Sequence, residues 1–188
     1  MLLYSASYDG QGAIAVRAAK DYTKLTGDPT HHALTLVRFG RFEEISELIS
    51  RPDGEATGAI WDFAQGYAAL RAGSVAEAKM FLRALDDVAH TTTETLRFHP
   101  ATQILGTLAY ILQGEILRTS GDLTGSIESF KQAVAVEDQM EFDEPEPLPF
   151  AARHWLGAAL LDAGQYEEAA KVFQEELADH PHNGWSLY

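Results

Sequence analysis

Apolar side chains in this chain recur three and four residues apart, in stretches that come in pairs. Within Phe150–Ala163 the apolar positions Leu156, Ala159 and Leu160 fall on one helical face, and Tyr166–Asp179 shows the same spacing. This is the spacing of an amphipathic α-helix, and no long apolar–polar alternation typical of strands occurs. The pattern predicts two helices that pack antiparallel across a short loop.

The same pairing is found upstream. We expect three earlier pairs, formed by Ala101–Ser120 with Leu123–Gln139, by Glu55–Ala72 with Val75–Ala89, and by Pro29–Phe39 with Phe42–Ser50. At the start of the chain we expect one helix over Asp9–Leu25, and its partner would be the short stretch Leu2–Ser7.

A glycine separates the two helices of every pair. Glycine suits this position because it readily adopts the left-handed conformation that ends a helix. A larger residue follows it two positions on, a small one five on and an apolar one nine on. The copies are Gly164, Tyr166, Ala169, Phe173; Gly121, Leu123, Ser126, Phe130; Gly73, Val75, Ala78, Leu82; Gly40, Phe42, Ile45, Ile49; and, without the large residue, Gly10, Gly12, Ala15, Ala19.

A second glycine precedes the turn glycine by seven residues in the last three pairs, at Gly66, Gly114 and Gly157. A larger side chain there would push the two helices apart, so we expect close approach to the small residues of the second helix, which are Ala78, Ser126 and Ala169. A recurring hairpin cannot bury its apolar face alone and must stack on its neighbours. The predicted fold is therefore all-α, a right-handed α-solenoid of tandem helix–turn–helix repeats.

These residues resemble the tetratricopeptide repeat family, whose unit is a helix–turn–helix of 34 residues. The last unit matches best, at Leu156, Gly157, Leu160, Gly164, Tyr166, Ala169, Phe173 and Pro181. The order of segments is similar to that of uncharacterised bacterial members. The resemblance implies a superhelix whose concave groove binds a protein or peptide, and it implies no catalytic activity.

We expect a single domain over residues 1–188. Its units lie at about 1–25 (partial), 26–52, 55–90, 100–139 and 148–181, and a further unit starts at 182–188. Both ends look incomplete, because Leu2–Ser7 is short for a first helix. The chain is therefore interpreted either as a fragment of a longer protein or as one whose ends pair with another copy.

Two insertions lengthen the steps between units. Residues 91–95 predict a turn that leads to Pro100 at a helix start. Residues 137–149 are acidic and carry Pro145, Pro147 and Pro149, which favour an extended arm. We expect this arm to lie over the edge of the solenoid.

Composition narrows the class of partner. Of the 188 residues, 46% are apolar, which is typical of a globular chain, and 28 acids against 14 bases give a net charge of −14. Such an acidic chain is a poor candidate for nucleic acid or anionic lipid and suits a basic or apolar partner. With no apolar run of about 20 residues and no charged leader, we expect a cytoplasmic protein.

No pattern indicates catalysis. The chain has no cysteine, and its seven histidines show neither HExxH nor a paired His-x3-His spacing for a metal. Phosphate-binding loops and a GxSxG elbow are also absent. We expect no enzyme activity, no cofactor and no metal.

The register implied by the resemblance places positions ten, six, three and two residues before each turn glycine in the concave groove. From them we take as peptide-groove candidates Arg38, Phe63, Tyr67, Arg71, Ile111, Glu115, Arg118 and His154. Arg38, Arg71 and Arg118 would form a ladder for carboxylates of a peptide. The alternative is that these arginines pair with the chain's own acids. The family's Lys and Asn clamp for a peptide C-terminus is not matched.

The sequence therefore predicts a non-catalytic scaffold that binds a protein or peptide in its concave groove. Two alternatives stay open. One is a self-association module, a homo-oligomer formed through the ends Leu2–Ser7 and Trp185–Tyr188. The other is a regulatory domain of a larger protein.

Overall fold

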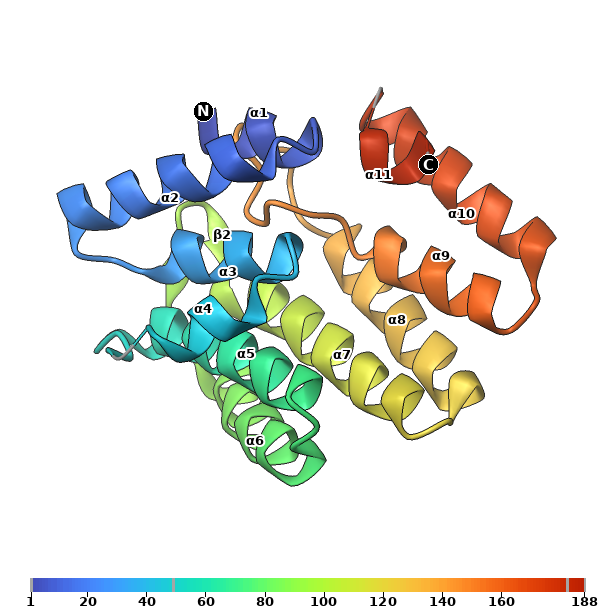
Figure 1. Cartoon of the computed structure of the whole chain (residues 1–188), viewed down its shortest axis with the longest axis horizontal. Helices are drawn as coiled ribbons and strands as arrows, with labels where there is room; N and C mark the ends of the chain where they lie inside the picture. The colour runs from blue at the N-terminus through green and yellow to red at the C-terminus, as the bar shows by residue number, and fades with distance from the viewer. Residues whose placement is uncertain (1, 49, 182, 188) are drawn as a thin grey trace.

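A computed structural model describes residues 2–48, 50–181 and 183–187. Over these ranges it contains eleven α-helices and one two-stranded hairpin, so the expected all-α fold is confirmed (Figure 1). Ile49 of the glycine pattern lies outside the described residues, as do His182 and Tyr188 of the last expected segment.

The helices form antiparallel pairs that follow one another along the chain (Figure 1). The pairs are α1 (Leu2–Tyr8) with α2 (Gly12–Thr26), α3 (Thr30–Arg38) with α4 (Phe42–Ser46), α5 (Glu55–Arg71) with α6 (Val75–Thr91), α7 (Ala101–Thr119) with α8 (Leu123–Glu137), and α9 (Arg153–Asp162) with α10 (Tyr166–Asp179); α11 (Gly184–Leu187) follows. Each pair packs on the next. Most bounds lie within three residues of those expected.

Helix α4 is shorter than predicted, because it ends at Ser46 instead of Ser50. The Ser46 hydroxyl donates to the carbonyl oxygen of Glu43 at 2.6 Å. Serine side chains that bond nearby backbone compete with helix formation, and Pro52 stands only a few residues further on.

The turn glycines have the backbone conformation that their role requires. Gly40, Gly73, Gly121 and Gly164 have φ of 66°, 87°, 84° and 72°, and Gly10 has 73°. Only glycine enters this left-handed region without a steric penalty. The predicted turn positions are therefore confirmed.

The second glycines also lie at close approaches. A Cβ on Gly66 would stand 2.9 Å from Phe81 Cβ and 3.6 Å from the carbonyl oxygen of Ala78, so the expected approach to Ala78 is confirmed. A Cβ on Gly114 would stand 2.7 Å from Phe130 Cδ1, and a Cβ on Gly157 would stand 2.6 Å from Phe173 Cε1. Each phenylalanine is the apolar residue nine positions after the turn glycine. The side chains nearest to these two glycines are therefore the aromatic rings, instead of the expected Ser126 and Ala169.

The step from α6 to α7 contains a hairpin that the sequence analysis did not predict. Strand β1 (Thr95–Leu96) pairs antiparallel with β2 (His99–Pro100). Arg97, in the turn between them, has φ of 57°. Pro100 stands at the N-cap of α7, so the expected helix start is confirmed. Two-residue strands are too short to show the alternation that reveals a strand.

Residues 138–152, named the arm here, do not lie over an edge as expected. The arm runs from α8 toward α1 and α3 and returns to α9 (Figure 1). Its residues Leu148 and Phe150 are 3% and 1% exposed. The Phe150 ring lies 6.5 Å from that of Phe63 and 4.9 Å from that of Trp155. Burial of these apolar side chains holds the last part of the arm, residues 148–152, in the interior, whereas Phe142 is exposed, and α9 begins after the arm, at Arg153.

Candidate binding site on the face of the first helices

The first helices of successive pairs bring several groove candidates into one line of ion pairs. Arg71 on α5 pairs with Glu115 on α7. Arg118, one turn further on α7, lies 3.2 Å from Glu115 and 2.5 Å from Asp162 on α9. The stacking of α5, α7 and α9 thus places side chains that are far apart in sequence side by side. Arg71 and Arg118 pair with the chain's own acids, which is the alternative weighed for them.

The apolar candidates are enclosed by the chain itself. Phe63 and Ile111 are fully buried, and Tyr67 is 4% exposed. The Tyr67 hydroxyl accepts from Trp155 Nε1 at 2.9 Å and from Arg71 at 3.2 Å. Burial, with the charge of Glu115, raises the pKa of Tyr67 to about 12. A peptide would reach these side chains only after the arm and α9 had moved, and their role in binding stays a prediction.

Arg38 and His154 face each other across this side of the molecule. Arg38 Nη1 donates to His154 Nδ1 at 2.8 Å. The Arg38 guanidinium also lies 4.3 Å from the ring centre of Trp185 in α11. Burial lowers the pKa of Arg38 to about 10 and lowers that of His154, although a hydrogen bond to Glu176 opposes the change in His154. A neutral His154 accepts the arginine hydrogen bond.

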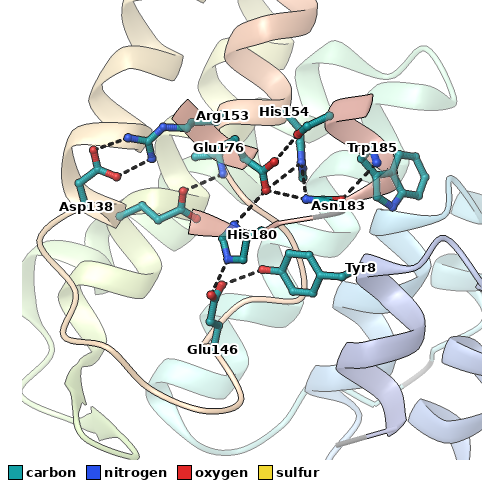
Figure 2. A network of polar contacts seen from close by, with 12 residues as sticks. Tyr8, Asp138, Glu146, Arg153, His154, Glu176, His180, Asn183 and Trp185 are labelled. Atoms are coloured by element: carbon teal, nitrogen blue, oxygen red, sulfur yellow. Dashed lines mark hydrogen bonds and ion pairs between the residues drawn. The ribbon is translucent and has the colours of Figure 1, made fainter. Parts of the chain in front are cut away.

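Glu176 is the centre of a buried polar network that links α9, α10 and α11 (Figure 2). It is 1% exposed and accepts from Asn183 Nδ2 at 2.6 Å and from the Ser186 hydroxyl. His180 Nδ1 lies 2.9 Å away. Burial opposes ionisation of Glu176, but hydrogen bonds from His154, His180, Ser186 and Asn183 outweigh it and hold its pKa well below its usual range.

The same network joins the last pair to the arm and to α1 (Figure 2). His180 pairs with Glu146 of the arm, and the Tyr8 hydroxyl donates to Glu146 at 2.7 Å. The rings of Tyr8 and His180 stack at 4.9 Å. Hydrogen bonds to Glu146 and Glu176 raise the pKa of His180 to about 10, although burial opposes this.

The two ends of the chain therefore contact each other. Trp185 Nε1 donates to the carbonyl oxygen of Ser7 at 3.1 Å, and its ring lies 5.8 Å from that of Phe39. Of the residues in this closure, only Arg38 and His154 were groove candidates, and Ser7 and Trp185 belong to the ends that were expected to meet another copy. The Glu176–His180 spacing of four residues, at the C-terminal end of α10, is a local signal, whereas most other partners are distant in sequence.

A pocket of about 580 Å³ remains where α1, α2 and α3 meet the hairpin, the arm, α5 and α7. Its walls are mainly apolar, and its aromatic side chains are Tyr4, Tyr22 and His31. Its apolar lining includes Leu2, Leu3, Leu25, Leu34, Ile60 and Ile104. Leu25 is 86% exposed and Leu2 is 63% exposed, so the pocket borders solvent. A pocket of this size and composition is typical of a ligand site.

Neither a metal site nor a membrane-spanning helix is supported by the described part of the chain. Within it, no group of three or more His, Asp or Glu side chains could hold a metal ion. None of the helices seen there has both the length and the apolar character needed to cross a bilayer.

Stacked antiparallel helix pairs, each turning at a left-handed glycine, define a helical-repeat protein. Residues 109–184, from within α7 to the first residue of α11, match the family model described as tetratricopeptide repeat, and this part of the chain belongs to that family. Proteins built from these repeats generally mediate protein–protein interactions. No curated protein and no solved structure matches the chain.

Proposed function

We propose that this chain is a non-catalytic scaffold that binds a protein partner through a peptide segment on the side of its first-of-pair helices. The observation that carries the proposal is the 580 Å³ pocket, because it is concave, mainly apolar and bordered by α1, α3, α5 and α7. A side chain of the partner peptide would enter it as an anchor. The rest of that face is filled by the arm and by Trp155, and Pro145 and Pro147 of the arm form one wall of the pocket.

The predicted groove residues keep a supporting role in this proposal. Phe63, Tyr67 and Ile111 are buried in the core and hold α5 and α7 in place. Arg71 and Arg118 fix the stacking of α5, α7 and α9 through Glu115 and Asp162. Changes at these positions would therefore alter binding mainly through the shape of the scaffold.

Selection of short random peptides displayed on phage against the full chain tests this proposal. Bound peptides are then measured by fluorescence anisotropy against two variants. Leu25→Asn, at the rim of the pocket, removes the apolar contact without adding charge and should weaken binding about ten-fold, equivalent to about 1.4 kcal/mol. Met80→Asn provides the matched control, because Met80 is an exposed apolar residue on α6, at 66% exposure. Peptides that bind Leu25→Asn and the parent chain equally would contradict the proposed site.

Self-association through the ends is the competing proposal. It requires α1 and α11 to leave each other, because Trp185 already donates to Ser7 and Tyr8 already stacks on His180. Light scattering over a concentration series distinguishes the two, since a strict monomer would end this alternative. A role as a regulatory domain of a larger protein stays a prediction.

A further inference from the structure

The aromatic side of the pocket presents ring faces and edges in a fixed arrangement. The rings of Tyr22 and His31 lie 5.0 Å apart at 77°, and those of Tyr4 and His31 lie 6.0 Å apart at 74°. The Tyr4 hydroxyl is 3.4 Å from His31 Nδ1, which holds the two side chains together. Faces of aromatic rings are electron-rich and attract cations.

His31 itself does not supply a competing positive charge. Burial lowers the pKa of His31 below its usual value, Asp28 opposes this, and Arg97 adds to it. The imidazole is therefore neutral near pH 7, and its ring can serve as one wall of a cation site.

Carboxylates stand beside these rings. Asp28 lines the pocket and is half-buried, and its Oδ1 accepts from the backbone N–H of Thr30 at 2.9 Å. The hydroxyl of Thr30 donates to the same oxygen. Across residues 2–48, 50–181 and 183–187, no hydrogen bond or ion pair uses Asp28 Oδ2. The pocket lining also includes Asp21, which pairs with Lys24 at 2.9 Å, and Glu146, which pairs with His180, so Asp28 is the acid whose charge matters most for a ligand.

The one arginine in the pocket lining is already neutralised. Arg97 Nη2 lies 2.9 Å from Asp143 Oδ1, and Arg97 Nη1 donates to the carbonyl oxygen of Pro145 at 2.9 Å. An incoming cation would therefore meet the charge of Asp28 without a competing arginine, in a molecule whose net charge is −14. An anion would be repelled by the same carboxylate.

We propose that this pocket takes a lysine or arginine side chain of the partner protein. Its methylenes would lie on Leu25, Leu34 and Ile60, and its charged end would lie among Tyr22, His31 and Asp28. Long basic side chains commonly cover apolar surface in this way while their charge reaches a polar site. The inference rests on the proposed function, and it adds the chemistry of the partner residue that enters the pocket.

Three probes with the same six-carbon chain test the proposal on the full chain: hexylammonium, 1-hexanol and hexanoate. Binding is followed by amide chemical shifts in ¹⁵N spectra. Hexylammonium should shift Thr30, His31 and Ile60 saturably, with at least about five-fold higher affinity than hexanoate. Equal or tighter binding of hexanoate, shifts that map away from the pocket, or no saturable binding of hexylammonium would each overturn the proposal.

Variants separate charge from shape. Asp28→Asn keeps the Oδ1 acceptor for Thr30 and removes the charge, so it should weaken hexylammonium about five-fold and leave 1-hexanol unchanged. Tyr22→Leu, which keeps an apolar side chain, should also weaken hexylammonium selectively. Asp87→Asn on α6 is the matched control at an exposed acid and should change nothing.

The two proposals can fail separately. Selected peptides that bind at the pocket without a basic residue, and that are unaffected by Asp28→Asn, would remove this inference and leave the proposed function standing. Peptides that bind equally well to Leu25→Asn would remove the proposed site, whatever hexylammonium does.

Discussion

Arg38 on α3 and His154 on α9 are hydrogen-bonded at 2.8 Å although 116 residues separate them in the chain. This contact joins the second helix pair to the fifth. Together with the Trp185–Ser7 and Tyr8–Glu146 contacts, it closes the row of helix pairs on itself. The pocket of about 580 Å³ where α1, α2 and α3 meet the arm stays open beside this closure.

Glu176 should be the acid on which the closure most depends. Glu176→Gln weakens the acceptor for Asn183 and Ser186 and leaves His180 with one carboxylate fewer. We expect the free energy of unfolding to fall by about 1–3 kcal/mol, because hydrogen bonds to a buried charge are strong. Glu175→Gln is the matched control. The neighbouring Glu175 side chain is 49% exposed, and its ion pair with Lys171 is long, at 3.7 Å. Urea denaturation measures both, and equal effects would contradict this role.

Stability should decline at alkaline pH because of His180. Its pKa is raised from 6.5 to about 10 by hydrogen bonds to Glu146 and Glu176. A base whose folded pKa exceeds the unfolded value contributes stability that is complete below pH 6.5 and is lost as the pH rises through about 10.

His180→Gln should flatten that decline, by at most about 1.4 kcal/mol per pH unit. Glu176 has the opposite dependence. Its pKa is lowered, so its contribution is present above the ordinary value of 4.5 and is lost as the pH falls. Denaturation curves between these limits measure both effects. A decline of unchanged slope in His180→Gln would show that His180 is not the group responsible.

Two glycines of α7 should respond in opposite directions to the same substitution. Gly114→Ala places a Cβ 2.7 Å from Phe130 Cδ1, so we expect a loss of about 1–3 kcal/mol from overpacking. Gly106→Ala meets only Val136 Cγ1 at 3.8 Å, and alanine favours the helix by about 0.5–1 kcal/mol over glycine. Thermal unfolding of the two variants measures this difference. A melting temperature unchanged by Gly114→Ala would show that the helices can separate at no cost.

The arm should contribute to the core through Phe150 and not through its exposed aromatic residue. Phe150→Ala removes a ring that is 1% exposed and touches Phe63 and Trp155, so we expect a loss of about 3–5 kcal/mol. Phe142→Ala is the control on the same arm, at 88% exposure, and should change stability by no more than about 0.5 kcal/mol. Calorimetry measures both. A small effect of Phe150→Ala would place the arm outside the cooperative core.

The helix pairs were predictable because their signals are local. A helix is visible in apolar spacing, and a turn in a glycine such as Gly121, because each depends on a few neighbouring residues. The side chain nearest to Gly114 is Phe130 instead of the expected Ser126, since spacing indicates which residues face each other but not which side chain reaches across. The β1–β2 hairpin was too short to leave a pattern.

By itself, the amino-acid sequence determined the number and order of the helical pairs, their turns and their membership of a repeat fold. Only the tertiary structure decided where the arm runs, how Glu176 gathers its partners and which part of the first-helix face stays open. The physical reason is the distance along the chain over which each kind of interaction acts. Helix and turn are set by backbone conformation and spacing within a few residues, whereas contacts such as Arg38–His154 depend on how small rotations between successive pairs add up.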